Sequence, residues 1–223
     1  MVLFTDFSKS YSKKNVINKS NFELKNNKIS FIMGPNGSGK TTLIKCMYDM
    51  EDYHGNISFN STSVEQVRDK SLVIWDDCPF YTNLSGIDNL IIFSEGKKTK
   101  KQIINIAKSF IDYELLITKV KKYSYGQKKK LALILIDILE PEYLIMDEIT
   151  NGLDYDAIRN LKDYIRNWSK KMTILLTGHQ FGFYNDLIDD LFIIKNNQIS
   201  LIVENFANSE LKLEDIYDEE IHI

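Results

Sequence analysis

The sequence contains few of the residues that mark secreted or metal-binding chains. Its 223 residues include only two cysteines, Cys46 and Cys78, which lie in unrelated contexts and form no CxxC pair. Structural disulfides and cysteine metal sites depend on an oxidising compartment or on closely spaced cysteines, so we expect neither here. This composition favours a reduced, cytosolic compartment.

The sequence also lacks a long apolar run and an excess of basic residues. The longest apolar stretch, residues 131–139, is interrupted by Asp137 and is shorter than the roughly 18 residues that a membrane span needs. Asp6 and Lys9 interrupt the N-terminus early, which argues against a signal peptide. With 28 basic and 31 acidic residues the net charge is -3, so nucleic acid is not an expected partner. We expect a soluble chain that reaches a membrane only through a partner.

Short apolar strands alternate with helical patterns along the chain, which favours an α/β fold with a largely parallel sheet. Lysine-rich stretches at 97–101 and 119–122 are interpreted as solvated helix ends, with contact to lipid headgroups as the alternative. Helices are expected over 40–50 and 155–168, and residues 84–139 have a helical pattern throughout. Strands are expected at 29–33, 55–59, 72–75, 143–146 and 172–177, followed by a hairpin of 191–195 and 198–203 around Asn196-Asn197.

Residues 34–42, GPNGSGKTT, match the phosphate-binding pattern GxxxxGK[ST] between an expected strand and an expected helix. The glycines permit backbone conformations that aim successive N–H groups inward, and the helix adds its partly positive N-terminus. Lys40 can reach the β- and γ-phosphates of a nucleotide, and the Thr41 hydroxyl can bind Mg²⁺. The pattern predicts a nucleotide phosphate site made of Gly34, Pro35, Asn36, Gly37, Ser38, Gly39, Lys40, Thr41 and Thr42.

The apolar residues 143–146 end in two carboxylates, Asp147 and Glu148. In P-loop ATPases an acid at the end of a strand holds Mg²⁺, and Asp147 has that position here. The adjacent Glu148 can accept a proton from the attacking water or orient it. A buried strand followed by surface acids is the other interpretation, and the phosphate-binding loop upstream disfavours it.

The segment 123–127, Tyr-Ser-Tyr-Gly-Gln, precedes three lysines and an expected helix. It resembles the signature motif of ATP-binding cassette (ABC) ATPases, usually LSGGQ followed by a basic stretch. The whole chain resembles that family in motif order, spacing and length. The resemblance implies one ABC ATPase domain over 1–223, with a P-loop NTPase core, an antiparallel β subdomain and a helical subdomain inserted at approximately 77–140.

The resemblance also implies roles for residues outside the phosphate-binding loop. Tyr11 resembles the aromatic residue that stacks on adenine, although core packing is the alternative for an aromatic there. His179 takes the position of the switch histidine that contacts the γ-phosphate. Asp76 lies approximately at the Q-loop position, which implies a contact with the metal. Asp154 closes the D-loop and is included among the nucleotide-binding residues.

In the family, two subunits meet head to tail and each ATP lies between one P-loop and the partner's signature motif. This implies that Ser124, Gly126 and Gln127 bind the phosphates held by a second subunit, although Ser124 could also be a plain helix N-cap. Tyr125 replaces a glycine of the motif, as Asp76 replaces the usual glutamine. We expect Tyr125 to be helical or extended, with its ring directed away from ATP toward its own helical subdomain or the partner's surface.

The function that the resemblance implies is hydrolysis of Mg-ATP by a subunit on the cytoplasmic face of the cell membrane. Its partners would be a separate transmembrane transporter subunit and a second ATPase subunit, either identical or a paralogue. The motif form Tyr-Ser-x-Gly is more similar to exporters of peptides, drugs or lipids than to importers. A soluble ABC ATPase of the iron–sulfur assembly type, without a transporter, is the alternative.

Overall fold

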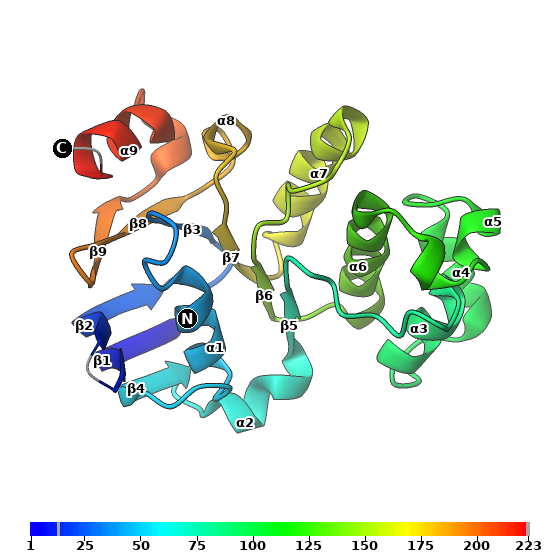
Figure 1. The fold of residues 1–223 in the computed structure, drawn as a ribbon, viewed down its shortest axis with the longest axis horizontal. Helices are drawn as coiled ribbons and strands as arrows, with labels where there is room; N and C mark the ends of the chain where they lie inside the picture. The colour runs from blue at the N-terminus through cyan, green and yellow to red at the C-terminus, as the bar shows by residue number, and fades with distance from the viewer. Residues whose placement is uncertain (13, 222–223) are drawn as a thin grey trace.

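The larger sheet is built mainly from parallel strands. The computed structural model, which describes residues 1–12 and 14–221, orders these strands β5-β6-β7-β3-β8-β9 (Figure 1). Neighbours from β5 to β8 are parallel, whereas β9 pairs antiparallel with β8. Every residue of β3, β6 and β7 is buried, because helices cover both faces. The strands are β3 (Ile29–Met33), β5 (Ser71–Ile74), β6 (Tyr143–Met146), β7 (Thr173–Thr177), β8 (Asp190–Lys195) and β9 (Gln198–Val203).

These strands agree with the sequence-based expectation to within one residue at each end. The expected hairpin is confirmed, and its turn residues Asn196 and Asn197 have φ of 51° and 62°. Two consecutive positive φ values are typical of the type I′ turn that suits the twist of antiparallel strands. The helix expected over 40–50 is shorter: α1 (Lys40–Met47) ends where Asp49 takes a φ of 52° and starts a turn.

A smaller antiparallel sheet, ordered β2-β1-β4, lies beside α1. Apolar residues from this sheet, from α1 and from one face of the larger sheet form a single buried cluster that includes Phe4, Leu43 and Leu175. Periodicity did not predict its two long strands, because lysine, serine and asparagine fill their exposed positions and register shifts break the alternation. The strands are β1 (Val2–Tyr11), β2 (Lys14–Leu24) and β4 (His54–Phe59).

The helical pattern expected over 84–139 is present as several helices with their own apolar cluster, which includes Leu90, Ile103 and Leu116. The chain turns between the first two at Glu95 and Gly96, both with positive φ. The lysine-rich stretch 97–101 runs into the N-terminus of α4, and 119–122 precedes α6. The helices are α3 (Gly86–Phe93), α4 (Lys100–Ala107), α5 (Tyr113–Leu116) and α6 (Tyr125–Leu139), with a 3₁₀ turn η2 (Val120–Lys122).

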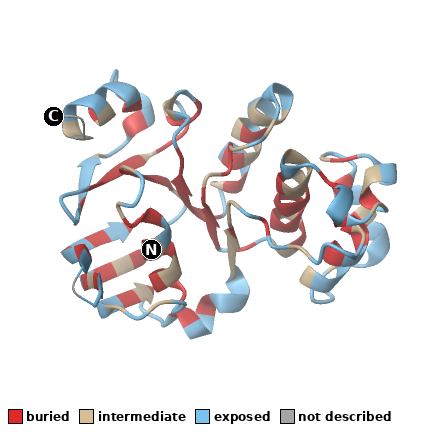
Figure 2. Cartoon of the chain, in the orientation of Figure 1, coloured by how far each residue is buried: buried red, intermediate tan, exposed pale blue. Residues whose placement is uncertain are grey.

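Helix α6 is apolar on nearly every side because it is buried from two directions (Figure 2). Leu133 and Ile136 pack into the core of the larger sheet, whereas Leu131 and Ile134 pack among the other helices. Asp137, which interrupts the apolar run, accepts a hydrogen bond from the Trp168 indole N–H at 2.7 Å. Helix α6 therefore joins the helical side of the molecule to the sheet.

The remaining helices complete the core and the edges. Helices α7 to α9 cover the face of the larger sheet opposite α1, where Leu161, Tyr184 and Leu213 are buried. Among the described residues, no helix combines the length and apolar character needed to cross a bilayer. These elements are α2 (Val64–Val67), α7 (Tyr155–Trp168), α8 (Phe181–Tyr184) and α9 (Leu213–Ile221), with 3₁₀ turns η1 (Arg68–Lys70) and η3 (Phe206–Asn208).

The fold generates one stability prediction, at the buried Asn89. Its side chain accepts from the Tyr81 N–H at 2.8 Å and donates to the carbonyls of Tyr81 and Ser85, so it fixes the segment before α3. Asn89→Ala leaves these backbone groups unpaired and should lower the free energy of unfolding by about 1–3 kcal/mol. Urea unfolding measures the change, with the exposed Asn105→Ala as control; equal midpoints for the two variants would contradict this account.

Candidate active site

The loop of residues 34–39 connects β3 to α1 at the carboxyl edge of the parallel sheet. Gly37 and Gly39 have φ of 77° and 109°, a region that glycine adopts without the steric cost of a side chain. Gly39 is the N-cap of α1, so the first free N–H groups of this eight-residue helix open onto the loop. This backbone forms an anion-binding concavity, as the sequence pattern predicts.

Lys40 is buried at the first turn of α1, and burial lowers the pKa of its ammonium group. Its Nζ donates to the carbonyl oxygens of Gly34 at 2.7 Å and Pro35 at 3.2 Å, so the side chain folds back over the loop. No carboxylate of the described residues lies within ion-pair distance of this Nζ. A buried cation without an anionic partner fits a bound polyphosphate.

Asp147 brings together the strand end and the loop. Its carboxylate, which is buried, accepts hydrogen bonds from the hydroxyl of Thr41 at 2.9 Å and from that of Thr177 at the end of β7. Carboxylate and hydroxyl oxygens beside a phosphate cradle are the donors that Mg²⁺ prefers. Of the three residues predicted to hold a metal, Thr41 and Asp147 therefore lie together and their chemistry fits Mg²⁺.

Glu148 follows Asp147 and has a left-handed backbone conformation and a carboxylate of which only one oxygen has a partner among the described residues. Its φ is 52°, and its Oε1 is 3.3 Å from Nε2 of His179, which follows β7. Its Oε2 is buried and has no hydrogen-bond partner among the described residues. Burial raises the pKa of this carboxyl, although the nearby His179 and Lys40 act in the opposite direction. A buried, unpaired acceptor with a raised pKa is suited to receive a proton from water.

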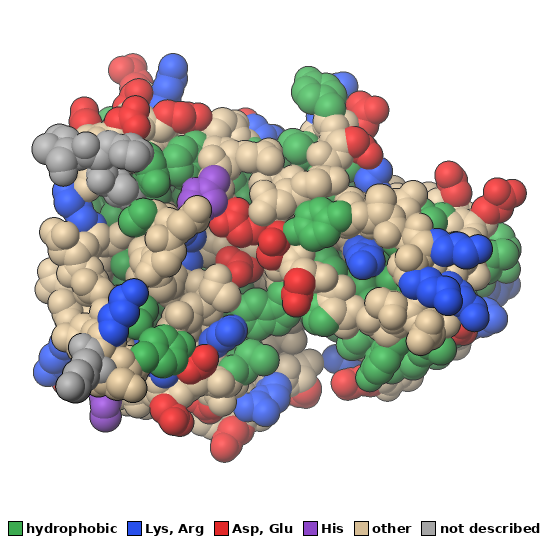
Figure 3. All heavy atoms as spheres, in the orientation of Figure 1, with side chains coloured by type: hydrophobic (Ala, Val, Ile, Leu, Met, Phe, Trp, Pro, Cys, Tyr) green, Lys and Arg blue, Asp and Glu red, His purple; other side chains and the backbone are tan. Residues whose placement is uncertain are grey.

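Acidic side chains gather in the middle of the face drawn in Figure 3, between the sheet side and the helical side of the molecule. Beside them a cleft of about 290 Å³ runs along the loop. Its lining includes Tyr11, a residue that is 42% exposed, and also Glu148. Lys14 and Val16 line it too, and sequence analysis missed them because it did not predict β2. The predicted loop residues in its wall are Asn36, Gly37, Gly39, Lys40, Thr41 and Thr42.

The signature segment does not line this cleft. Ser124 is the N-cap of α6: its Oγ accepts from the Gln127 N–H at 3.2 Å, and the Gln127 side chain accepts from the Ser124 N–H at 2.8 Å. Ser124 is thus a helix N-cap in this subunit. Ser124 is exposed and Gln127 is half-exposed. A role for Ser124, Gly126 and Gln127 in binding phosphate stays a prediction that requires a second subunit.

Tyr125 is helical, as expected, but its ring takes a different direction from the predicted ones. It lies over Gly152, where any β-carbon would collide with the ring, and its hydroxyl donates to the carboxylate and the carbonyl of Asp76. The ring therefore packs on its own D-loop rather than on the helical subdomain. The reason is that Gly126 lies directly against the Gly152 carbonyl, which brings the start of α6 onto this loop.

Two further predicted residues have partners within the chain. The Asp76 carboxylate accepts from Tyr125, from Lys129 at 3.2 Å and from Asn151 at 3.3 Å. Asp154 is the N-cap of α7, where it accepts from the Ala157 N–H and from Lys130 Nζ at 2.7 Å. The hydrogen bond from Lys130 lowers the pKa of Asp154. Their predicted contacts with metal and nucleotide stay predictions.

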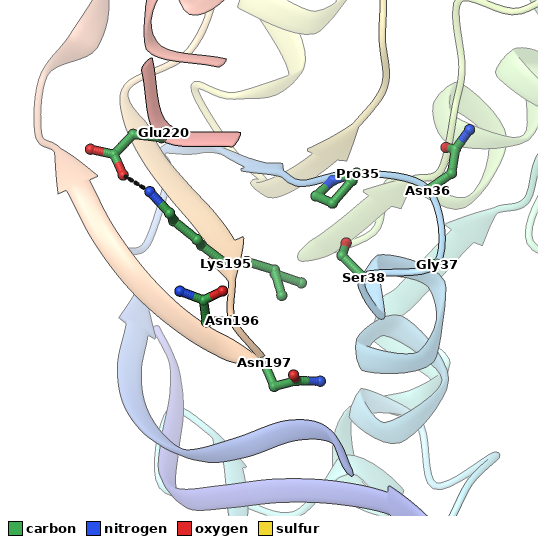
Figure 4. Close-up of a pocket in the computed structure, with 9 residues that line it drawn as sticks. Pro35, Asn36, Gly37, Ser38, Lys195, Asn196, Asn197 and Glu220 are labelled. Atoms are coloured by element: carbon green, nitrogen blue, oxygen red, sulfur yellow. Dashed lines mark hydrogen bonds and ion pairs between the residues drawn. The ribbon is translucent and has the colours of Figure 1, made fainter. Parts of the chain in front are cut away.

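A second pocket, of about 390 Å³, opens on the other side of the phosphate-binding loop (Figure 4). Pro35 to Ser38 form one wall, and the turn residues Asn196 and Asn197 form another. An ion pair of 3.0 Å between Lys195 and Glu220 closes one side. The sequence contains no motif for this pocket, because it arises from packing of the β8–β9 hairpin and α9 beside the loop.

The geometry predicts a loss of nucleotide affinity for Lys40→Ala. This change removes the buried cation at the cradle and its charge-assisted hydrogen bonds to phosphate, so Mg-ATP should bind at least about tenfold more weakly. Calorimetric titration measures the affinity, with Lys45→Ala, a half-exposed lysine in the last turn of the same helix, as a control for the loss of a lysine. Unchanged affinity in Lys40→Ala would show that the loop does not hold phosphate.

The ABC transporter family model matches residues 17–151, more than half of the chain. The lantibiotic transport ATP-binding protein SrtF of Streptococcus pyogenes is 29% identical over 99% of this chain and 97% of its own. The bacitracin transport ATP-binding protein BcrA of Enterococcus faecalis is 27% identical over 92% of this chain and 69% of its own.

The solved structure of an ATP-binding subunit of an ABC transporter has the same fold. It superposes with a TM-score of 0.81 at 24% identity and covers 98% of this chain and 92% of that one. The P-loop NTPase core with an antiparallel β subdomain and a helical subdomain, expected from the sequence, is confirmed. Because this family model spans the phosphate-binding loop, the signature segment and the 147–148 pair, the chain belongs to the ABC transporter family, as an ATP-binding subunit with ATPase activity.

Proposed function

We propose that this ATPase hydrolyses Mg-ATP between two head-to-tail subunits and drives export of a peptide, drug or lipid through a separate transmembrane subunit. The observation that carries the proposal is the unpaired, buried Oε2 of Glu148 at the cleft that contains the phosphate-binding loop. The same cleft contains none of the signature residues, so one subunit supplies only part of the site.

The residues around the cleft divide the chemistry of hydrolysis. The loop N–H groups and Lys40 bind the phosphates, and Thr41 and Asp147 hold Mg²⁺, which neutralises charge that develops on the phosphate oxygens. Glu148 accepts a proton from the attacking water or orients it, because its Oε2 is free to accept. His179, 3.3 Å from the other oxygen of Glu148, fixes that carboxylate and faces the γ-phosphate.

The second subunit completes the site with its signature segment. Ser124 and Gly126 lie at the exposed N-terminus of the 15-residue helix α6, where free N–H groups and the helix dipole favour an anion. Because these residues are absent from their own cleft, we assign them to the ATP held by the partner, which is either a second copy or a paralogue. ATP then stabilises the dimer, and hydrolysis releases it.

We also propose that 1–223 is one ABC ATPase domain whose helical subdomain spans about 77–140. The separate apolar cluster formed by α3 to α6 supports this division. So does the position of α6, which contributes side chains both to that cluster and to the sheet core.

The surface next to the helical subdomain fits a transmembrane partner. An apolar groove of about 220 Å³ lies between β5 and α6 and is lined by Trp75, Pro79 and Phe80, among others. Beside it, Ile91 and Ile92 on α3 are 37% and 46% exposed, and Figure 3 shows hydrophobic side chains gathered along this edge. Exposed apolar patches of this kind mark interaction sites, so we propose that the transmembrane subunit docks here and holds the ATPase on the cytoplasmic face of the membrane.

Two observations support the proposed export. The relatives SrtF and BcrA are named for transport of a lantibiotic and of bacitracin, which supports a transported substrate of that kind. The signature segment has the form Tyr-Ser-x-Gly, which is more similar to that of exporters than to that of importers. The iron–sulfur assembly alternative is not favoured, because these relatives are transport proteins.

The central test is Glu148→Gln, which keeps the shape of the side chain and removes its basicity. ATP turnover should fall by about 10²-fold or more, while Mg-ATP still binds. The variant should then accumulate as an ATP-dependent dimer, measured by light scattering with and without Mg-ATP. Near wild-type turnover would overturn the role of Glu148, and a variant that stays monomeric with ATP bound would overturn the shared site.

The docking surface and the direction of transport can be tested together in cells. Ile92→Glu places a charge in the apolar patch, so it should lose co-purification with the transmembrane subunit, while turnover of the isolated ATPase stays unchanged. Resistance to externally added peptide antibiotics should be lost with Ile92→Glu and with Glu148→Gln, but not with Lys101→Glu on the exposed face of α4. Resistance in all three variants would contradict export of such peptides.

A further inference from the structure

Lys129 is a fully buried lysine whose ammonium group lies where three segments meet. Its side chain is 0% exposed, although it belongs to a run of three lysines that reads as a solvated stretch. Nζ lies 3.2 Å from the Asp76 carboxylate, 3.4 Å from the Trp75 carbonyl and 3.3 Å from the Glu148 carbonyl. The signature helix, the segment after β5 and the loop after β6 therefore share one cation.

Burial of a lysine costs free energy unless its ammonium group is paired and hydrogen-bonded, and lysine is almost never fully buried without such partners. Among the described residues, Nζ of Lys129 has a single carboxylate within ion-pair distance, that of Asp76, which is itself half-exposed. Two of its three acceptors are backbone carbonyls. The three acceptors of Nζ therefore account for a lysine at this buried position. The acceptor of chemical interest is the carbonyl of Glu148.

The backbone of Glu148 needs such support. A φ of 52° at a residue other than glycine costs about 1–2 kcal/mol, so the conformation persists only when its surroundings impose it. The Glu148 N–H donates to the Thr177 hydroxyl at 3.3 Å, and its carbonyl accepts from the Asn151 N–H at 3.2 Å. Lys129 supplies the second donor to that carbonyl. The side chain of Glu148 points into the cleft because both peptide groups around it are fixed.

Lys129 is in turn held by the two residues that depart from the family pattern. Asp76 binds its ammonium group, and Tyr125 donates to Asp76 while its ring lies 5.5 Å from Nζ. Asn151 donates its side-chain amide to the same carboxylate. A glutamine at position 76 would supply no charge for Lys129, and a glycine at position 125 would supply no hydroxyl for Asp76.

We propose that Lys129 is a positioning residue for ATP hydrolysis: it fixes the Glu148 carbonyl, and Asp76 and Tyr125 keep it in place. This inference rests on the proposed role of Glu148. The inference gives Asp76 and Tyr125 a function within their own subunit. Through Lys129 they connect the signature helix to the backbone of Glu148, the residue proposed to activate water. When the signature helix moves, Lys129 moves with it, and the support of Glu148 changes.

The test compares Lys129→Met with Lys129→Arg in steady-state ATP hydrolysis. Lys129→Met keeps the length and removes the donor, so kcat should fall about tenfold while KM for ATP changes less than about twofold. Lys129→Arg keeps the charge and should recover a substantial part of kcat. The exposed Lys101→Met is the matched control and should behave like the wild type. A fall in affinity equal to the fall in kcat would overturn the inference.

A double-variant cycle separates this inference from the proposed function. If Lys129 acts through Glu148, Lys129→Met should lower the residual turnover of Glu148→Gln by less than about twofold, and the double variant should still dimerise with ATP. An inactive Glu148→Gln together with a fully active Lys129→Met would overturn the positioning role alone. An active Glu148→Gln would overturn the role of Glu148 first.

Two milder variants cover the case in which Lys129→Met does not fold. Tyr125→Phe removes one hydroxyl and should lower kcat about threefold with little change in KM. Asp76→Asn should lower kcat in the same way and leave the apparent affinity for Mg²⁺ unchanged. Wild-type kcat in both variants would overturn the proposal, and a weakened Mg²⁺ affinity in Asp76→Asn would instead assign Asp76 to the metal.

Discussion

The active site depends on the position of Asp147, which ties three strands of the sheet together at one edge. Its carboxylate accepts from Thr41, which follows β3, and from Thr177, which ends β7 between β3 and β6. The parallel register sets Thr177 beside Ile32 and Leu176 beside Met146, so all three strands end at the same level. The hydroxyl groups of Thr41 and Thr177 both reach the Asp147 carboxylate, so this acid joins the loop helix to the end of β7. Glu148, the next residue, gains its place from the same arrangement.

The local motifs of this site can be predicted from the sequence, whereas most of the contacts that join these motifs in space cannot. The strand–loop–helix around Lys40 and the pair at 147–148 could be predicted, because phosphate binding and metal binding need particular residues at fixed spacing. The strands 2–11 and 14–24 could not be predicted from periodicity, since register shifts break the alternation of buried and exposed residues along them. The partners of Asp76 were also out of reach: Tyr125 lies 49 positions away, and nothing in either residue's neighbourhood indicates the other.

The residues that depart from the family pattern, Asp76 and Tyr125, are accommodated by their neighbours and by each other. Tyr125 needs room for its ring, and Gly152 supplies it, because a β-carbon there would collide with the ring. Gly126 is constrained in the same way by the Gly152 carbonyl, so the signature helix and the D-loop are in contact through two glycines. Close backbone packing transmits small displacements better than long side chains do, since packed atoms have few alternative arrangements. The tyrosine adds a hydrogen bond to this contact and extends it to Asp76.

Most polar groups of the site are satisfied within the chain, which determines what nucleotide binding must exchange. Lys40 binds the carbonyls of Gly34 and Pro35, and Ser124 and Gln127 bind each other. Under the proposed roles, each of these bonds would be exchanged for one to phosphate, so the affinity would reflect a difference between two sets of hydrogen bonds. Because charge-assisted bonds are roughly twice as strong as neutral ones, the exchange favours phosphate at Lys40 most. Glu148 differs: its buried Oε2 has no bond to give up among the described residues, so in the proposed mechanism the attacking water would gain a hydrogen bond there without displacing another.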